Sequence, residues 1–175
     1  MNRIEDQARQ IAEPFLEKHG CKLWDVVFEK EGALHYLRIL FDGGNDGNSA
    51  LDMQKCEELT PPLNKLMDKQ KFIKEVDILE IGSPGITRRL RHEKHFESCI
   101  DKPVRIMRRT DNGKTETIIG ILQNYSAENK SIVLKSTKLE EKQVMILSLK
   151  KCIRINLEAL TEVAIPSLDT AEGTQ

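Results

Sequence analysis

Two stretches in the first half of the chain have the apolar spacing of amphipathic helices. In residues 4–16, apolar side chains recur every three or four positions, although Pro14 should kink or shorten the helix. A second stripe predicts another helix that Ser49 can cap, because a serine hydroxyl accepts a hydrogen bond from the first backbone N–H groups. Pro61 and Pro62 should break or sharply bend this helix. Its buried side should consist of Met53, Cys56, Leu59, Leu63, Leu66 and Met67.

β-branched and aromatic residues mark three strands between and after these helices. Residues 21–28 and 33–41 flank the turn-forming pair Glu31-Gly32, which predicts an antiparallel hairpin. The apolar run 76–81 predicts a third strand. The order α-β-β-α-β indicates a sandwich in which two helices pack on one face of a small sheet.

The pattern changes after residue 92. Residues 93–100 can form one or two helical turns, and five short β-like runs follow with turn signals between them. Short strands at regular spacing predict a small all-β barrel. The five runs are 104–107, 117–122, 131–134, 144–149 and 152–157.

The fold class that we expect is therefore α+β, with two domains. An N-terminal α/β domain should occupy residues 1–91, a short helical linker 92–102, and the barrel 103–160. Residues 161–175 are polar and should form a flexible tail.

Charge is unevenly distributed, although the formal net charge is only −1. Residues 1–82 carry −5, residues 83–157 carry +8, and residues 158–175 carry −4. One region can therefore meet an anionic partner while the rest of the chain keeps the protein soluble.

We expect no catalytic residue, no metal and no cofactor. The four cysteines lie far apart without a C-x-x-C pair, and His92 and His95 lack both the H-E-x-x-H pattern and a third ligand nearby. Pro84 directly follows Ser83, and proline has no backbone N–H to complete an oxyanion hole. The start of the chain is charged and no apolar run is long enough to span a bilayer, so we expect a cytoplasmic protein without membrane association.

The most informative segment is the run from Ile81 to Arg91, where an apolar strand ends at Ser83-Pro84-Gly85 and three arginines follow. A guanidinium group can hold two phosphate oxygens through parallel hydrogen bonds, so this segment favours an RNA partner. Aromatic residues make up only 5% of the chain, which favours backbone recognition over base stacking. The turn should present the arginines, or it serves only to join the domains. The candidate RNA-binding residues are Arg88, Arg89, Arg91, Lys94, Arg105, Arg108 and Arg109.

The same residues resemble a known family. The motif Ser83-Pro84-Gly85-x-x-Arg88-x-Leu90, followed by Phe96-x-x-x-Ile100-x-Lys102-Pro103-Val104, is similar to the signature of the RimP family of ribosome maturation factors. Supporting matches are Ile11-Ala12-Glu13-Pro14, Leu23-x-Asp25-Val26 and Asp52-x-x-x-Cys56, and the resemblance covers roughly residues 4–157. Asp101 departs from the family pattern, which often has glycine before Lys-Pro-Val.

The resemblance implies a fold and a set of partners. It implies an N-terminal α/β domain followed by an SH3-like (Sm-like) barrel, and non-catalytic binding to the immature 30S subunit late in its assembly. The implied partners are the small ribosomal subunit, its rRNA and small-subunit ribosomal protein twelve. The seven candidate cations would contact rRNA, Leu90 would belong to the turn motif, and we expect a monomer.

Two other functions stay open at this point. A general RNA-binding chaperone built on an Sm-like barrel should bind free single-stranded RNA and form rings. An enzyme acting on nucleotides, with Ser83, His92 and His95 close together, would require a metal or phosphate at that site.

Overall fold

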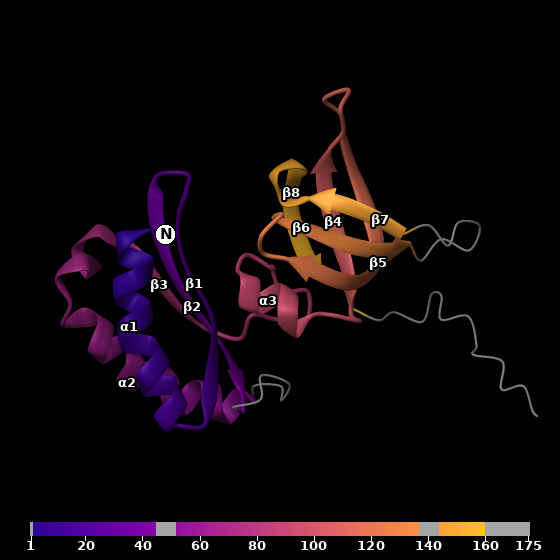
Figure 1. The fold of residues 1–175 in the computed structure, drawn as a ribbon. Helices are drawn as coiled ribbons and strands as arrows, with labels where there is room; N and C mark the ends of the chain where they lie inside the picture. Colours follow the sequence, from indigo (N-terminus) through magenta and orange to yellow (C-terminus); the bar gives the residue numbers. More distant parts are fainter. Residues whose placement is uncertain (1, 45–51, 137–143, 160–175) are drawn as a thin grey trace, which may run out of the picture. The chain divides into compact units, whose positions relative to one another are not determined.

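The computed structural model describes residues 2–44, 52–136 and 144–159 and divides the chain into two compact units, Met1–Gly85 and Ile86–Gln175. The protein is mixed α/β, and its described part contains three α-helices and two sheets (Figure 1). The expected flexible tail at 161–175 lies outside the described residues.

The first unit is a three-stranded sheet with two helices on one face (Figure 1). The strand order is β1-β2-β3; β1 pairs antiparallel with β2, and β3 pairs parallel with β2. Apolar side chains from both helices and from β1 and β2 form one buried core, which includes Leu16, Val26, Ile39 and Leu63. The elements are α1 (Arg3–Lys18), β1 (Cys21–Glu31), β2 (Leu34–Gly43), α2 (Met53–Asp68), the 3₁₀ helix η1 (Lys71–Glu75) and β3 (Ile78–Gly82).

Both helices continue through their prolines, so neither the predicted shortening of the first helix nor the predicted break in the second occurs. α1 runs past Pro14 to Lys18, and α2 runs through Pro61 and Pro62 to Asp68. All three prolines are exposed, so water can hydrate the carbonyl groups that lose a backbone N–H partner. The apolar stripe of each helix stays buried on the other side, and this packing outweighs the local penalty.

The start of α2 also differs from the prediction. The cap is Asp52, whose side chain accepts a hydrogen bond from the backbone N–H of Lys55 at 2.7 Å. Ser49 lies outside the described residues. Met53, predicted to be buried, is 78% exposed, because the first turn of α2 extends beyond the core.

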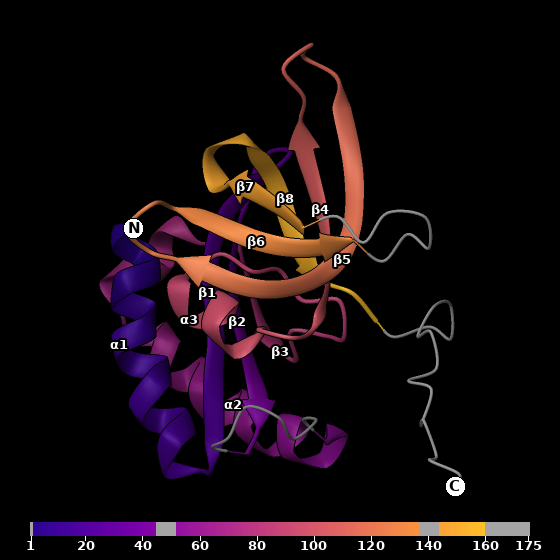
Figure 2. The ribbon, with the colours of Figure 1, turned by 45° about the vertical axis from the view of Figure 1, so that its right-hand side comes forward.

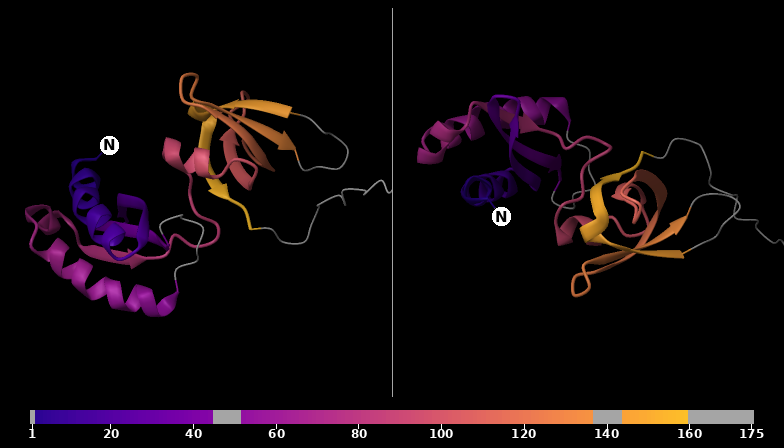
Figure 3. Two further views of the ribbon diagram at one scale, coloured as in Figure 1. Left: turned by 60° about the horizontal axis from the view of Figure 1, so that its bottom comes forward. Right: turned by 90° about the horizontal axis from the view of Figure 1, so that it is seen from above.

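The second unit is a curved five-stranded sheet preceded by a short helix (Figures 2 and 3). Its order is β7-β6-β5-β4-β8, and all neighbours pair antiparallel. Each of the five β-like runs in the sequence corresponds to one of these strands. The elements are α3 (Glu93–Ser98), β4 (Pro103–Arg109), β5 (Thr115–Ser126), β6 (Ser131–Ser136), β7 (Val144–Ser148), the 3₁₀ turn η2 (Leu149–Lys151) and β8 (Cys152–Leu157).

The sheet of the second unit is open in the described part of the chain. β7 and β8 are its two edge strands, and no pairing joins them. Part of the outer edge of β8 is instead occupied by a bridge between Arg89 and Asn156. The fully buried core on the inner side includes Val104, Ile106, Leu122, Ile132 and Leu134.

No helix in the described residues combines the length and apolar character needed to cross a membrane.

Candidate nucleic-acid interface

A glycine-dependent turn ends the first unit. β3 stops at Gly82, and the backbone N–H of Gly85 donates to Oγ of Ser83 at 3.2 Å. Gly85 has a φ of +77°, a left-handed conformation that side-chain-bearing residues adopt only with strain. The Ser-Pro-Gly sequence therefore has a local structural reason: serine accepts the turn hydrogen bond and glycine permits the change of direction.

Residues 88–90 then form a short extended segment along β8. The backbone N–H of Leu90 donates to the carbonyl of Ile155 at 2.8 Å, and the N–H of Leu157 donates to the carbonyl of Arg88 at 2.8 Å. These two bonds place the arginine-rich segment on the edge of the second sheet.

The extended backbone sends successive side chains of this segment to opposite faces. Leu90 is buried, only 4% exposed, and Arg88 shares its side and is half-buried. Arg89 is exposed and lies opposite Asn156. The structure thus separates the directions of Arg88 and Arg89.

A buried histidine organises the segment after Arg91. Nδ1 of His95 accepts hydrogen bonds from the backbone N–H groups of Arg91 at 3.1 Å and His92 at 3.4 Å. His95 therefore holds the start of α3 and the exit of the chain from Arg91. Lys94 is exposed on the first turn of this helix.

α3 is anchored to β5 by aromatic stacking. The rings of Phe96 and Tyr125 lie 5.0 Å apart between centroids and 16° from parallel. Phe96 is 4% exposed, and the Tyr125 hydroxyl donates to a carboxylate oxygen of Glu93 at 3.2 Å. Burial, together with this hydrogen bond to Glu93, raises the pKa of Tyr125.

Two of the predicted RNA-binding arginines have carboxylate partners. Arg105 donates to Glu158 at 2.5 Å, and this hydrogen bond raises the pKa of Arg105. Arg108 is paired with Glu116, the residue opposite it on β5. Both arginines thus carry less free positive charge than the sequence suggests.

Alternation along β4 decides which side chains face outward. Arg105, Met107 and Arg109 are exposed, whereas Val104 and Ile106 point to the core. Arg154 of β8 lies opposite Met107 and is also exposed. The outer face of β4 and β8 therefore mixes arginines with an apolar side chain.

Three cations in η2 and the first half of β8 are missing from the sequence-based candidates. Lys150, Lys151 and Arg154 lie more than forty positions from Arg108 in the sequence, yet the pairing of Arg108 with Cys152 brings the two segments together. Residues 108–116 and 150–154 carry six Lys or Arg against two Asp or Glu, a net charge of +4. Only the register of β4 and β8 could have identified this group.

Arginines in the first unit are differently placed. Arg38 on β2 forms ion pairs with Glu29, Glu31 and Glu80 of the neighbouring strands. These contacts, the hydrogen bond to Glu31 foremost, raise the pKa of Arg38. The positive charge of this arginine is more than balanced, and residues 1–82 carry a net charge of −5, so the excess of cations lies in the second unit.

No group of three or more His, Cys, Asp or Glu residues within 2–44, 52–136 and 144–159 could hold a metal ion. The rings of His92 and His95 are edge-to-face, 5.0 Å apart between centroids. Nδ1 of His95 is already used by backbone donors, so His95 has a structural role at α3.

Comparison with known protein families adds one finding. Residues 11–87 match the family model described as the RimP N-terminal domain. The match covers most of the first unit and ends two residues beyond Gly85. The cationic residues from Arg88 onward lie outside it.

Proposed function

Because the chain belongs to the RimP family of ribosome maturation factors, we propose that it binds the immature small ribosomal subunit and assists late subunit assembly without catalysing a reaction. The observation that carries this proposal is the RimP N-terminal domain at residues 11–87. The cationic second unit supports an RNA partner, since neutralising phosphates with Lys and Arg releases counterions and favours binding.

The proposed mechanism is differential binding. A factor that prefers one arrangement of RNA and protein shifts the assembly equilibrium toward it and leaves when later contacts form. The phosphate contacts that we propose come first from the exposed Arg89, Lys94 and Arg109. Arg88 and Arg91, which are half-buried, and Arg105 and Arg108, which pair with carboxylates, would contribute less.

The second unit is, in this proposal, an SH3-like domain. Four consecutive antiparallel strands followed by a 3₁₀ turn and a fifth strand that returns to the first support this assignment. The proposed organisation is an α/β domain in residues 1–91, a helical linker in 92–102 and the SH3-like domain in 103–160. We assign the contact with small-subunit ribosomal protein twelve to this last domain.

Co-sedimentation tests the function. The protein is mixed with small subunits from cells arrested in late assembly and, separately, with mature small subunits. We expect several-fold more protein to pellet with immature subunits, because only these offer the preferred arrangement. Equal binding to both, or binding to neither, would reject the proposal.

The rival function, an Sm-like chaperone that forms rings, fits the structure less well. A ring requires a head-to-tail interface, with one edge of the sheet pairing with the other edge of a second copy. Part of the outer edge of β8 already pairs with residues 88–90 of the same chain. This intramolecular pairing blocks continuous ring contacts along β8.

A further inference from the structure

We propose that a surface pocket between the β4–β5 turn and η2 binds a phosphate group of the RNA backbone. The inference rests on the proposed function and assigns it a specific anchor point. The pocket is lined by Arg109, Thr110, Asp111, Lys150, Lys151, Cys152 and Ile153.

An ion pair ties together the two sides of the pocket. Nζ of Lys151 lies 2.5 Å from a carboxylate oxygen of Asp111, which joins η2 to the β4–β5 turn. The hydrogen bond from Lys151 holds the pKa of Asp111 below its ordinary value. Asp111 therefore remains ionised and neutralises one of the cations of the pocket.

Other cations of the pocket are available to an anion. Within the described part of the chain, Arg109 and Lys150 have neither an ion pair nor a side-chain hydrogen bond, and both are exposed. The adjacent residues 108–116 and 150–154 together carry a net charge of +4. An arginine fork and an ammonium group at one depression provide the donors that a phosphate requires.

The side chains that line the pocket indicate which kind of anion it would bind. No aromatic side chain lines the pocket, so it offers no surface on which a base could stack. The lining combines three cations, one carboxylate and one hydroxyl with only two apolar side chains, Cys152 and Ile153. A sugar–phosphate backbone, recognised without base contacts, fits this composition better than a free nucleotide.

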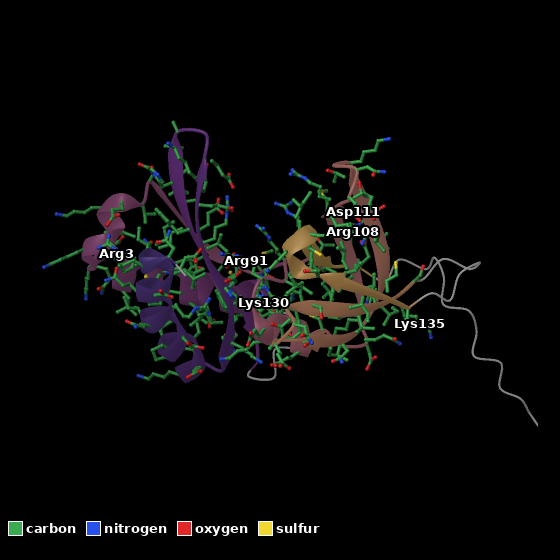
Figure 4. The ribbon with its side chains drawn as sticks, turned by 45° about the horizontal axis from the view of Figure 1, so that its top comes forward. Arg3, Arg91, Arg108, Asp111, Lys130 and Lys135 are labelled. Carbon is green, nitrogen blue, oxygen red and sulfur yellow. The ribbon has the colours of Figure 1, made fainter. Side chains whose placement is uncertain are left out.

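The pocket lies where a long polyanion can reach it. The β4–β5 hairpin projects beyond the other strands, and η2 lies at the same end of the sheet (Figure 2). Arg108 and Asp111 are seen together at this end, and Lys135 lies away from it (Figure 4). An RNA backbone that runs along the projecting hairpin would therefore reach the pocket.

The first experiment compares two double variants of the full chain. Arg109→Ala with Lys150→Ala removes the available cations, whereas Lys130→Ala with Lys135→Ala makes the same charge change elsewhere on the second unit. Binding to a fluorescein-labelled RNA hairpin is measured by anisotropy between about 50 and 200 mM salt. We expect the slope of log affinity against log salt concentration to become shallower by about one in the pocket variant, the value for one phosphate contact, and to change by less than half as much in the control.

Equal salt-dependence slopes for the two double variants would overturn the proposal that this pocket binds phosphate. A polyglutamate peptide that competes as well as unlabelled RNA at equal charge would overturn the assignment to RNA. Thermal unfolding of both variants, with a melting temperature close to wild type, shows that the comparison concerns binding.

A second experiment predicts a gain of binding. Asp111→Asn removes the carboxylate that neutralises Lys151, so RNA affinity should rise by about two- to fivefold at low salt. If Asp111 served only to hold the turn, the same substitution would weaken binding or leave it unchanged, and either result would contradict the proposal.

Subunit co-sedimentation separates this inference from the proposed function. Wild-type protein that fails to pellet with immature subunits would refute the function itself. Wild-type protein that pellets, together with a pocket variant whose subunit binding and RNA salt slope are unchanged, would refute only the pocket.

Discussion

At the residue scale, Phe96 decides how the short helix α3 is held. Its ring is 4% exposed and stacks on Tyr125. Phe96→Ala should lower the free energy of unfolding of the second unit by about 3 kcal/mol, because a large buried side chain is lost and a cavity remains. Phe96→Leu should cost less than half of this. Urea unfolding followed by circular dichroism measures both, and an unchanged midpoint for Phe96→Ala would contradict the packing role.

The stability of the first unit should depend on pH through Asp77. Its carboxylate accepts a hydrogen bond from the backbone N–H of His35 at 2.7 Å, which lowers the pKa of Asp77. A lowered pKa in the folded state means stabilisation that is present above about pH 4 and lost as the pH falls through the folded value. Wild type should therefore be more stable than Asp77→Asn at pH 7, and the difference should shrink below pH 4.

Trp24 provides the measurement, because it is the only tryptophan in the chain and lies in β1 of the first unit. Its fluorescence reports urea unfolding of that unit at each pH. A stability difference that stays constant down to pH 3 would show that the Asp77 carboxylate does not contribute as a charged acceptor.

Arg88 and Arg89 should differ in their effect on subunit binding. Arg89 is exposed, whereas Arg88 is half-buried on the side of Leu90. Arg89→Ala should make the slope of log subunit affinity against log salt concentration shallower by nearly one, the value expected for one phosphate contact. Arg88→Ala should change this slope less. Identical slopes for wild type and Arg89→Ala would remove Arg89 from the contact surface.

At the scale of the element, Gly120 permits the close approach of β5 and β6. A Cβ atom at this position would lie 2.6 Å from the carbonyl oxygen of Lys135 and 2.7 Å from Cγ of Leu134. Gly120→Ala should therefore cost about 1–3 kcal/mol through overpacking. Gly82→Ala is the control, because nothing lies within 4 Å of a Cβ atom there. Each variant is compared with wild type by urea unfolding, and a neutral Gly120→Ala would contradict the strand geometry.

The elements also show where sequence reasoning succeeds and fails. Residues 21–28 were expected to form a strand, and β1 covers them but continues to Glu31. Pro61 and Pro62 predicted a break in α2, yet Leu59, Leu63 and Met67 are buried along a continuous helix. Local propensity locates elements, but tertiary contacts extend them: pairing with β2 continues β1 to Glu31, and the buried apolar stripe keeps α2 continuous through its prolines.

At the scale of the whole molecule, the edges of the second sheet determine self-association. The outer edge of β8 pairs in part with residues 88–90, and this removes one of the two edges that a head-to-tail ring requires. We therefore expect a monomer of about 20.0 kDa in sedimentation equilibrium, with or without added RNA. A hexamer or heptamer would contradict this and favour the ring-forming chaperone.

The sequence by itself determined the order of helices and strands, the separation of charge and the turn at Ser83-Pro84-Gly85, because periodicity, composition and turn chemistry are local properties of the chain. Only the tertiary structure decided that Arg88 and Arg89 diverge and that Lys150 and Lys151 lie near Arg109. Strand register depends on pairing between distant segments, and the pairing of β4 with β8 fixes which face of the sheet each side chain lies on. The cationic pocket therefore depends on the register between β4 and β8, and no local motif in the sequence predicts it.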